Sequence, residues 1–452
     1  MKIVIIGCGK VGTALARRLC EDGHNITVID TDAVRIQQIT EALDVLGVVG
    51  NGSSYLALSE AGVENTDVLI AVTGSDELNL LCCMFAKKVG HCQAVARVRN
   101  PAYANEMEYI KKTLGISAII NPELAAAREI TELLKFPGAR NIDHFADGKV
   151  GLIKFELEND SKIAGVSLRD LPTHLNCDIL ICAVERGGDV IIPRGGFMLQ
   201  KGDVVSFIAT QDKAIDFFKK LGIPTEPVRS ALIVGGGTIG YYLAQNLIKL
   251  GVHVKIVENN LKHARELAEN LPQAIIIEGD GTNRQLLMSE GLPMTEAFVA
   301  LTNVDEENVI LSMFAKKHSS AKIATKINRL EFDDILDSVD IGSVVYPKYI
   351  TCDFMMQFVR ALKNKAGSNI KTLYRILDDR VEALEFTVSE ESEVTGKPLA
   401  QLRIKPNSLL CCITRGEKVI IPRGADTIQV GDSVIVVSLE KGLSDVQDIL
   451  VR

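Results

Sequence analysis

The sequence contains an internal repeat that spans almost its whole length. Residues 4–12, VIIGCGKVG, recur as LIVGGGTIG at residues 232–240, and MFAKK at residues 84–88 recurs unchanged at residues 313–317. Near the end of each half, VIIPRG at residues 190–195 recurs at residues 419–424. Self-similarity at a nearly constant spacing is typical of duplicated structural units. The chain is therefore a tandem duplication.

Each half contains two different patterns. The first alternates short β-branched runs (3–6, 26–29, 68–71, 94–98) with helical stretches (10–21, 32–43, 76–89), which predicts βαβ units and a parallel sheet. After Phe136-Pro137-Gly138, strand patterns at 149–156, 179–185, 190–192 and 204–209 precede a short helical one at 213–220. We therefore expect an α/β protein with two Rossmann-like parallel-sheet lobes, each followed by a small α+β lobe. The predicted boundaries are 1–137, 138–222, 228–367 and 368–452.

Composition excludes several functional classes. The 452 residues carry 50 Lys+Arg against 58 Asp+Glu, a net charge of −8, and only 5% aromatic residues. Nucleic-acid binding favours clustered cations and stacking rings, and anionic lipid also attracts cations, so neither is expected as a direct partner. Glycines interrupt the longest uncharged run, 230–248, so no membrane insertion is expected. With no signal peptide visible, the expected location is cytoplasmic, and the ten cysteines are expected to be buried free thiols.

A G-x-G-x-x-G sequence follows the first predicted strand of each half. In the first half, Gly7 would make the tight turn, Gly9 would let the backbone approach a pyrophosphate, and Gly12 would allow close packing of helix on strand. Free N–H groups at the start of the helix near Lys10 would face the phosphates. Asp30 would accept hydrogen bonds from both ribose hydroxyls and repel the 2′-phosphate of NADP. This context predicts a nucleotide site; the alternative is that the glycines serve packing alone.

The second half repeats these features and adds softer candidates. Gly235, Gly237, Gly240 and Glu258 occupy the matching positions. Further candidates in both halves are Asn51 and Asp280 after the third strand, Thr73-Gly74 and Thr302-Asn303 after the fourth, and Arg97, Arg99 and Lys326 after the fifth. Open parallel sheets bind ligands at this edge, and a guanidinium can hold a phosphate in a bidentate way. Turn formation, helix capping and surface ion pairing remain the alternatives for these residues.

Residues for catalysis are not apparent. The sequence has no G-x-x-x-x-G-K-[ST], which argues against a P-loop hydrolase. His144 and His174 are the only histidines of the first small lobe, and the second small lobe has none. We therefore expect no enzymatic activity and no metal site. An NAD-dependent oxidoreductase remains the alternative from another functional class.

The segments VIIGCGKVG, VIDTD, AVTGSDELN and IPRGG, in this four-lobe order, closely resemble the RCK/KTN family over essentially the whole chain. The resemblance implies a cytoplasmic protein, peripheral to the membrane, that binds NAD(H) or ATP/ADP and gates a potassium-translocating membrane subunit. It also implies a homotetramer whose Rossmann lobes form a ring. Gating of another cation channel remains a further alternative.

The resemblance also assigns nucleotide contacts. In the first half they fall on Gly7, Cys8, Gly9, Lys10, Val11, Asp30, Thr73, Gly74 and Arg97; in the second half they fall on Gly235, Gly236, Gly237, Thr238, Ile239, Glu258, Thr302, Asn303 and Lys326. Two positions depart from the family pattern. Asn51 stands where relatives often have Asp, and Lys326 stands where the first copy has Arg97. The ligand of each site is therefore left open, and the two sites need not bind the same one.

Overall fold

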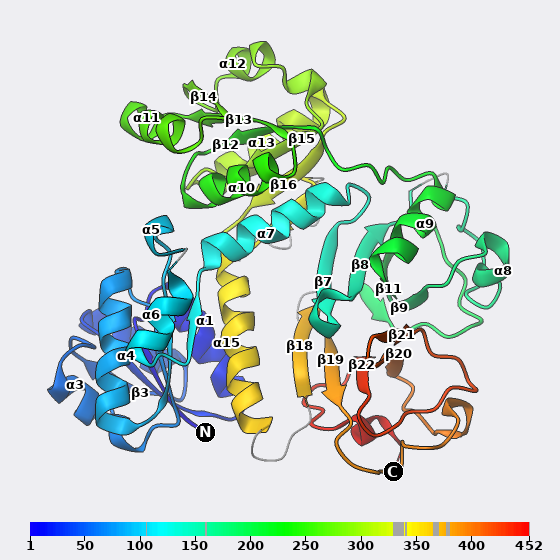
Figure 1. Cartoon of the computed structure of the whole chain (residues 1–452), viewed down its shortest axis with the longest axis horizontal. Helices are drawn as coiled ribbons and strands as arrows, with labels where there is room; N and C mark the ends of the chain where they lie inside the picture. Colours follow the sequence, from blue (N-terminus) through cyan, green and yellow to red (C-terminus); the bar gives the residue numbers. More distant parts are fainter. Residues whose placement is uncertain are drawn as a thin grey trace. The chain divides into compact units, whose positions relative to one another are not determined.

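The compact units of the structure do not correspond to the two halves of the repeat. The computed structural model describes residues 1–104, 106–158, 161–328, 339, 341–364, 370–376 and 380–451. One unit joins residues 1–131 with 228–359, and the other joins 132–227 with 360–452. Each unit therefore combines equivalent parts of both copies (Figure 1).

The first unit contains two six-stranded parallel sheets with the same strand order. These are β3-β2-β1-β4-β5-β6 in the first Rossmann lobe and β14-β13-β12-β15-β16-β17 in the second. The first lobe comprises β1 (Lys2–Ile6), α1 (Lys10–Glu21), β2 (Asn25–Asp30), α2 (Ala33–Ala42), β3 (Leu46–Val49), α3 (Tyr55–Glu60), β4 (Val68–Ala71), α4 (Asp76–Gly90), β5 (Gln93–Arg97), α5 (Pro101–Ala104), α6 (Met107–Leu114), β6 (Ala118–Ile120) and α7 (Pro122–Lys135). The second comprises β12 (Ser230–Val234), α10 (Thr238–Lys249), β13 (His253–Glu258), α11 (Leu261–Asn270), β14 (Ile275–Glu278), α12 (Arg284–Ser289), β15 (Ala297–Ala300), α13 (Asp305–His318), β16 (Lys322–Lys326), β17 (Ser343–Val345) and α15 (Pro347–Asn364).

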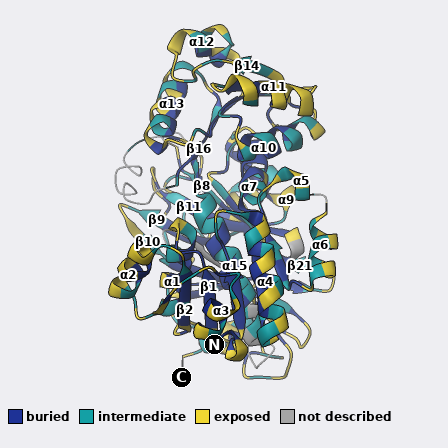
Figure 2. Cartoon of the chain, turned by 90° about the vertical axis from the view of Figure 1, so that its left-hand side faces the viewer, coloured by how far each residue is buried: buried dark blue, intermediate teal, exposed yellow. Residues whose placement is uncertain are grey.

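Burial explains why these segments form strands and helices. The central strands β1 (KIVII) and β4 (VLIA) are continuous aliphatic runs, and all their residues except Lys2 are buried. Such runs suit parallel strands that are covered by helices on both faces. Helices such as α11 and α12 keep exposed outer sides (Figure 2). The side chain of Asp32 caps α2 by accepting from the N–H groups of Val34 and Arg35 at 3.0 and 3.3 Å.

Each Rossmann lobe sends one helix to the other lobe. In α15, Asp353 Oδ1 lies 2.6 Å from Nη1 of Arg18 on α1, and the guanidinium of Arg18 covers the Tyr349 ring at 4.6 Å. On the other side, Asn121, which precedes α7, donates to the hydroxyl of Tyr242 on α10 at 3.0 Å. The crossing places α15 beside the glycine-loop helix of the first lobe and α7 beside that of the second (Figure 1).

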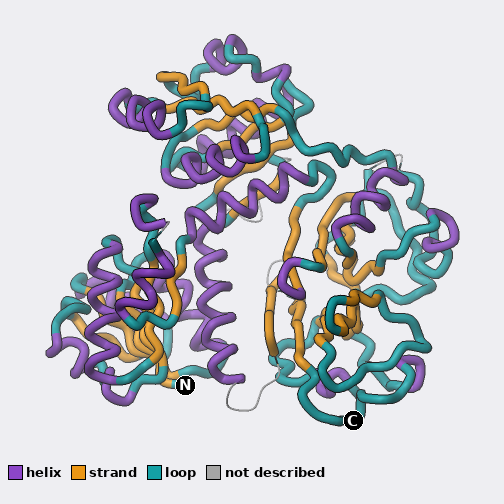
Figure 3. The backbone as a smooth tube through the Cα atoms, viewed as in Figure 1, coloured by secondary structure: helices purple, strands orange, loops and turns teal. Residues whose placement is uncertain are grey.

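The second unit contains two five-stranded sheets, ordered β10-β9-β11-β8-β7 and β18-β19-β22-β20-β21. Its elements are β7 (Asn141–Phe145), β8 (Val150–Glu156), α8 (Leu171–Leu175), β9 (Leu180–Arg186), β10 (Asp189–Ile191), β11 (Val204–Ala209), α9 (Gln211–Leu221), β18 (Ile370–Ile376), β19 (Val381–Thr387), β20 (Ser408–Arg415), β21 (Lys418–Ile420) and β22 (Ser433–Ser438). All pairs of neighbouring strands are antiparallel. Figure 3 shows the strands of this unit in orange, with long loops in teal between them. One hydrophobic core joins both sheets through Cys182 and Ala183 of the first copy and Ala383 and Cys411 of the second.

The structure confirms the predicted fold class and the duplication. All ten cysteines are free, as expected; nine are buried, and Cys20 is partly exposed. Strand β7 was not predicted, because its sequence NIDHF carries polar residues at three of its five positions. Within the described part of the chain, no helix combines the length and hydropathy that a bilayer crossing requires. The four lobe boundaries stay predictions.

Candidate functional site

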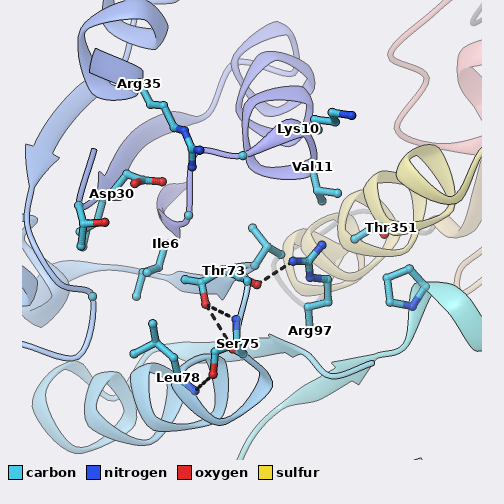
Figure 4. Close-up of a pocket in the computed structure, with 18 of the residues that line it drawn as sticks. Ile6, Lys10, Val11, Asp30, Arg35, Thr73, Ser75, Leu78, Arg97 and Thr351 are labelled. Atoms are coloured by element: carbon cyan, nitrogen blue, oxygen red, sulfur yellow. Dashed lines mark hydrogen bonds between the residues drawn. The ribbon is translucent and has the colours of Figure 1, made fainter. Parts of the chain in front are cut away.

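A cavity of about 540 Å³ lies at the carboxyl ends of the strands of the first Rossmann sheet (Figure 4). Its lining combines the glycine loop, the ends of β2, β4 and β5, and three segments that come later in the chain. The lining residues are Ile6, Gly7, Gly9, Lys10, Val11, Ile29, Asp30, Thr31, Arg35, Gly50, Asn51, Gly52, Val72, Thr73, Gly74, Ser75, Leu78, Arg97, Pro122, Glu123, Asn328, Pro347, Lys348 and Thr351. We call this cavity the first site.

The three loop glycines differ in whether the fold itself requires a glycine at their position. Gly7 adopts φ of +101°, a conformation that other residues rarely adopt. A Cβ on Gly12 would lie 1.8 Å from the carbonyl oxygen of Gly7, so only glycine allows α1 to start this close. A Cβ on Gly9, in contrast, would meet no atom within 4 Å. Packing therefore explains Gly7 and Gly12, whereas the open space at Gly9 belongs to the cavity.

Asp30 holds the turn between β1 and α1 while it faces the cavity. Its Oδ2 accepts the N–H of Cys8 at 2.6 Å, and its Oδ1 accepts the N–H of Asp32 at 2.9 Å. Each carboxylate oxygen has a further lone pair, so both can still accept a hydroxyl hydrogen. The geometry suits a carboxylate that anchors a ribose diol at this end of the cavity.

The loops after β3 and β4 contribute ordered polar groups. Asn51 Oδ1 accepts from the backbone N–H and the hydroxyl of Ser53 at 3.0 and 2.9 Å, which leaves its amide nitrogen for the cavity. Thr73 donates its hydroxyl to Asn79 Oδ1 at 2.7 Å, and Ser75, not Thr73, caps α4. The hydrogen bonds between Asn51 and Ser53 are those of a turn, which is the alternative role for Asn51. Both Asn51 and Thr73 also line the cavity.

Arg97 lies across the cavity from Asp30 (Figure 4), and Glu123, which also lines the cavity, interacts with its charge. Arg97 donates through Nη2 to the Thr73 carbonyl at 2.7 Å, but its buried Nε has no hydrogen-bond partner among the residues that the structure describes. Within the same residues, the buried Oε2 of Glu123 also has none. Burial, and next the charge of Arg99, lower the pKa of Arg97, and burial raises the pKa of Glu123. Unsatisfied buried polar atoms are costly, so this end of the cavity suits a polar, charged ligand.

The second Rossmann lobe completes the first site. Asn328 after β16, with Pro347, Lys348 and Thr351 of α15, lines the same cavity as the glycine loop of the first lobe. Figure 4 shows α15 at one side of the cavity, close to Arg97. The crossing helix therefore places a lysine from the second copy at a site that the sequence assigned to the first copy alone.

Some predicted residues lie outside the lining. Cys8 is buried, and burial together with the charge of Asp30 raises the pKa of its thiol to about 12; its backbone N–H serves Asp30 instead of a ligand. Gly12 packs closely against the carbonyl oxygen of Gly7 and is not among the residues that line the cavity. Arg99 is turned away, with its Nη2 on the Gly74 carbonyl at 2.6 Å and its Nε 3.6 Å from Asp76.

The second copy repeats the loop geometry. Gly235 has φ of +105°, a Cβ on Gly240 would lie 2.4 Å from the Gly235 carbonyl oxygen, and a Cβ on Gly237 would meet nothing within 4 Å. Glu258 Oε2 accepts the N–H of Gly236, and Oε1 that of Asn260, both at 2.9 Å. We call this set, with Thr238, Ile239, Asp280, Thr302, Asn303 and Lys326, the second site.

The second site differs from the first in its polar groups. A Cβ on Gly236 would lie 2.3 Å from Cδ1 of Leu267, so the Leu267 side chain would have to move to admit a residue such as the cysteine at position 8. Two hydrogen bonds from Thr282 lower the pKa of Asp280. Lys326 is buried, donates to the Leu301 carbonyl at 3.2 Å and lies 3.5 Å from Asn303 Oδ1. Burial lowers its pKa, and Asp305 and Glu123 oppose that shift.

Sequence reasoning found the glycine loop and the strand-end residues but missed Arg35, Glu123, Asn328, Lys348 and Thr351. Arg35 lies in the first turn of α2, five residues after Asp30, so its closeness in sequence to Asp30 could have indicated it. The other four depend on the crossing of α7 and α15. The Asn-Pro and Tyr-Pro sequences before these helices mark helix starts but carry no signal that the helices cross.

Comparisons with known proteins agree with this architecture. Residues 3–122 and 231–347 match the TrkA-N domain, and residues 152–222 and 383–451 match the TrkA-C domain. The Trk system potassium uptake protein TrkA homolog 1 of Methanosarcina mazei is 32% identical over 455 residues, covering 99% of each chain. The Trk system potassium uptake protein TrkA of Halomonas elongata is 32% identical over 98% of this chain and 96% of its own length. The GsuK channel bound to NAD has a similar fold, with a TM-score of 0.63 at 18% identity over 97% of this chain and 76% of that one.

Proposed function

Because this chain belongs to the TrkA family, we propose that it is a nucleotide-sensing regulatory subunit that gates a potassium-translocating membrane subunit of the TrkH or TrkG kind. The observation that carries the proposal is the cavity of about 540 Å³ in which the glycine loop, Asp30 and Arg97 come together. The relatives named above belong to potassium uptake systems, and that role is proposed here for this chain.

The residues of the first site fit an adenine nucleotide. Open space at Gly9 gives the phosphates access to the free N–H groups at the start of α1, where the helix dipole favours anions. Asp30 would accept the ribose hydroxyls and would repel a 2′-phosphate. NAD(H), ATP and ADP therefore fit, whereas NADP(H) does not. The GsuK channel that shares this fold was obtained with NAD bound, in line with this ligand class.

The second site is proposed to bind a nucleotide as well. Its loop glycines have the same geometry, and Glu258 holds the same backbone positions as Asp30. The chain would then carry two nucleotides, each anchored by its own acidic residue.

Regulation through several sites follows from the energies involved. A typical coupling free energy between two sites is about 1–3 kcal/mol. Moving a gate from 1:99 to 99:1 requires roughly 5.5 kcal/mol of differential binding. One site per chain would be marginal, whereas two sites in each chain of a homotetrameric ring would suffice. The ring would lie at the cytoplasmic face of the membrane and reach it through the partner.

A flux measurement tests the proposal. The purified chain and a potassium-translocating membrane subunit of the TrkH kind are reconstituted in vesicles, and potassium flux is recorded with ATP, ADP, NAD⁺ or NADH. We expect flux to depend on the nucleotide and the Asp30→Ala variant to lose part of that dependence. Flux that is indifferent to every nucleotide would contradict the proposal. Steady oxidation of bound NADH on adding a substrate would instead favour the oxidoreductase.

A further inference from the structure

The small lobes of the two copies bring matching cysteines into one core. Cys182 lies in β9, and Cys411 lies at the equivalent position of β20, in the aligned segments 179–186 and 408–415. Both side chains are fully buried in the hydrophobic core that the two small sheets share. The strands β9 and β20 contact each other although they belong to different sheets. The duplication therefore contributes one thiol from each copy to the same core.

Each of these cysteines occupies a β-bulge. The pairing of β9 with β11 skips Cys182, and the pairing of β20 with β22 skips Cys411. Each thiol donates to the carbonyl two residues before it, Cys182 to Leu180 at 3.2 Å and Cys411 to Leu409 at 3.3 Å. A bulge leaves one residue outside the ladder and changes the direction of its side chain. The same bulge in both copies therefore presents the two thiols to the shared core in the same way.

The two thiols also interact with each other. Burial raises the pKa of Cys411 well above its ordinary value, and next a side-chain hydrogen bond with Cys182 and the charge of Cys182 raise it further. Burial raises the pKa of the neighbouring Cys412 to about 12, and Cys182 acts on that thiol through its charge. A hydrogen bond requires the two side chains to be in contact. Cys182 and Cys411 therefore lie within reach of each other, as a disulfide requires.

A second group of cysteines in the first Rossmann lobe offers a comparison. Cys82, Cys83 and Cys92 share a core there, and burial, followed by the charges of the other two, raises the pKa of Cys83. The matching positions of the second copy carry no cysteine. A bond within this group would join neighbouring elements of one lobe. A bond between Cys182 and Cys411 would instead join the two copies.

We propose that Cys182 and Cys411 form a disulfide when hydrogen peroxide enters the shared core, and that this bond cross-links the two small lobes. One thiolate attacks a peroxide oxygen and becomes a sulfenic acid, and the hydroxide that leaves takes up the thiol proton to form water. The second thiol attacks the sulfenic sulfur, and the hydroxyl group leaves with the second thiol proton as another water. Each sulfur loses one electron, and one peroxide is reduced to two waters. The inference is independent of the nucleotide sites.

Burial controls when this reaction occurs. Neither side chain is exposed in the closed unit, and the thiolate, not the thiol, is the nucleophile. Peroxide therefore reacts when the two small sheets open locally. The bond then closes a loop of roughly 230 residues, which restricts the unfolded chain and stabilises the paired lobes. A thiol reductant breaks the bond again by exchange.

Peroxide treatment of the full-length chain tests the inference. After treatment the remaining thiols are blocked, and tryptic peptides are analysed by tandem mass spectrometry. We expect a cross-link between peptides 170–186 and 404–415, which fragmentation assigns to Cys182 and Cys411. We also expect the oxidised chain to unfold at a higher urea concentration than the reduced chain, and dithiothreitol to reverse this shift. Urea below the unfolding transition should speed up the reaction, because it populates the open form.

Alanine variants identify the two sulfur atoms. Cys182→Ala and Cys411→Ala should each lose the cross-link and the shift in urea midpoint. Cys412→Ala is the matched control and should keep both, since Ala183 already occupies the equivalent position in the shared core of the first copy. If an alanine variant does not fold, the peptide map of the wild-type chain still decides.

Three results would overturn the inference. The first is a wild-type chain in which peroxide oxidises other cysteines while Cys182 and Cys411 stay reduced. The second is a cross-link from Cys182 to Cys412, or one that persists in Cys411→Ala. The third is the expected cross-link without any shift in the urea midpoint, because the bond would then not stabilise the pairing of the small lobes.

Discussion

At the scale of single residues, some glycines of the loop are required for folding and another is free to serve binding. Gly7 and Gly12 are required by the backbone, since one has a positive φ and the other has no room for a Cβ. Gly9 has no such constraint and faces the cavity. The same division holds for Gly235, Gly240 and Gly237 in the second copy.

This division predicts opposite effects for two similar substitutions. Gly9→Ala should leave the melting temperature unchanged and weaken nucleotide binding at the first site. Gly12→Ala should lower the free energy of unfolding by about 1–3 kcal/mol, because its Cβ would lie 1.8 Å from the Gly7 carbonyl oxygen. Thermal melts and nucleotide titrations of both variants check this. Equal destabilisation by the two would show that Gly9 is also a packing residue.

Glu123 predicts a pH dependence of stability. Burial raises its pKa in the folded state, so the native chain binds more protons than the unfolded chain between the ordinary and the raised pKa. Stability contributed by this residue therefore falls as the pH rises through that window. We expect Glu123→Gln to melt at a higher temperature than the wild type at pH 8, with the difference shrinking toward pH 4. A difference that stays constant with pH would contradict this reading.

At the scale of elements, the crossing of α7 and α15 determines how the first site is completed. Arg18 is buried on α1, and it contacts both Asp353 and the ring of Tyr349. These contacts hold α15 where Lys348 and Thr351 reach the cavity. The second lobe thereby contributes to a site whose loop belongs to the first.

Removing the anchor of α15 should affect stability and binding together. Asp353→Asn weakens a partly buried, charge-assisted contact and should cost about 1.5–3 kcal/mol of unfolding free energy. It should also weaken ATP binding at the first site but not binding at the second. Glu266→Gln, which disrupts the exposed Lys262–Glu266 pair, is the control and should change stability by less than about 0.5 kcal/mol. If Asp353→Asn has as little effect as the control, α15 is held by other contacts.

Residues of the site that lie near the glycine loop in the sequence could be predicted, whereas those on the crossing helix α15 could not. Gly7, Gly9 and Asp30 were predicted because strand, turn and helix follow one another within about 30 residues of sequence. Lys348 was not, because it lies more than 300 residues from the loop and reaches it only through tertiary packing. The role of every predicted binding residue stays a prediction until a nucleotide is measured.

At the scale of the whole molecule, equivalent parts of the two copies pack together within each compact unit. Each compact unit takes one part from each copy, and the two small sheets share a core that includes Cys182 and Cys411. The repeat in the sequence predicted two equivalent halves. It could not show that equivalent parts pack against each other, because a hydrophobic pattern indicates which residues are buried but not which surface covers them.

This pairing predicts the behaviour of half of the chain. Residues 1–227 expressed alone would expose the core faces that the second copy covers, including Ala183 and Cys182 of β9. We expect no stable monomer of this fragment, but a dimer of two equivalent halves or an aggregate. Light scattering after size-exclusion chromatography measures the mass. A well-folded monomer would contradict the importance of the shared core.

The most direct test of the account is the number of nucleotides bound per chain. Native mass spectrometry of the full-length protein, saturated with ATP and NADH, counts the ligands and identifies each by mass. We predict two nucleotides per chain for the wild type, one for Asp30→Ala and one for Glu258→Ala. A wild-type chain that binds no nucleotide at saturation, or a loss of both ligands in each single variant, would contradict two independent sensing sites.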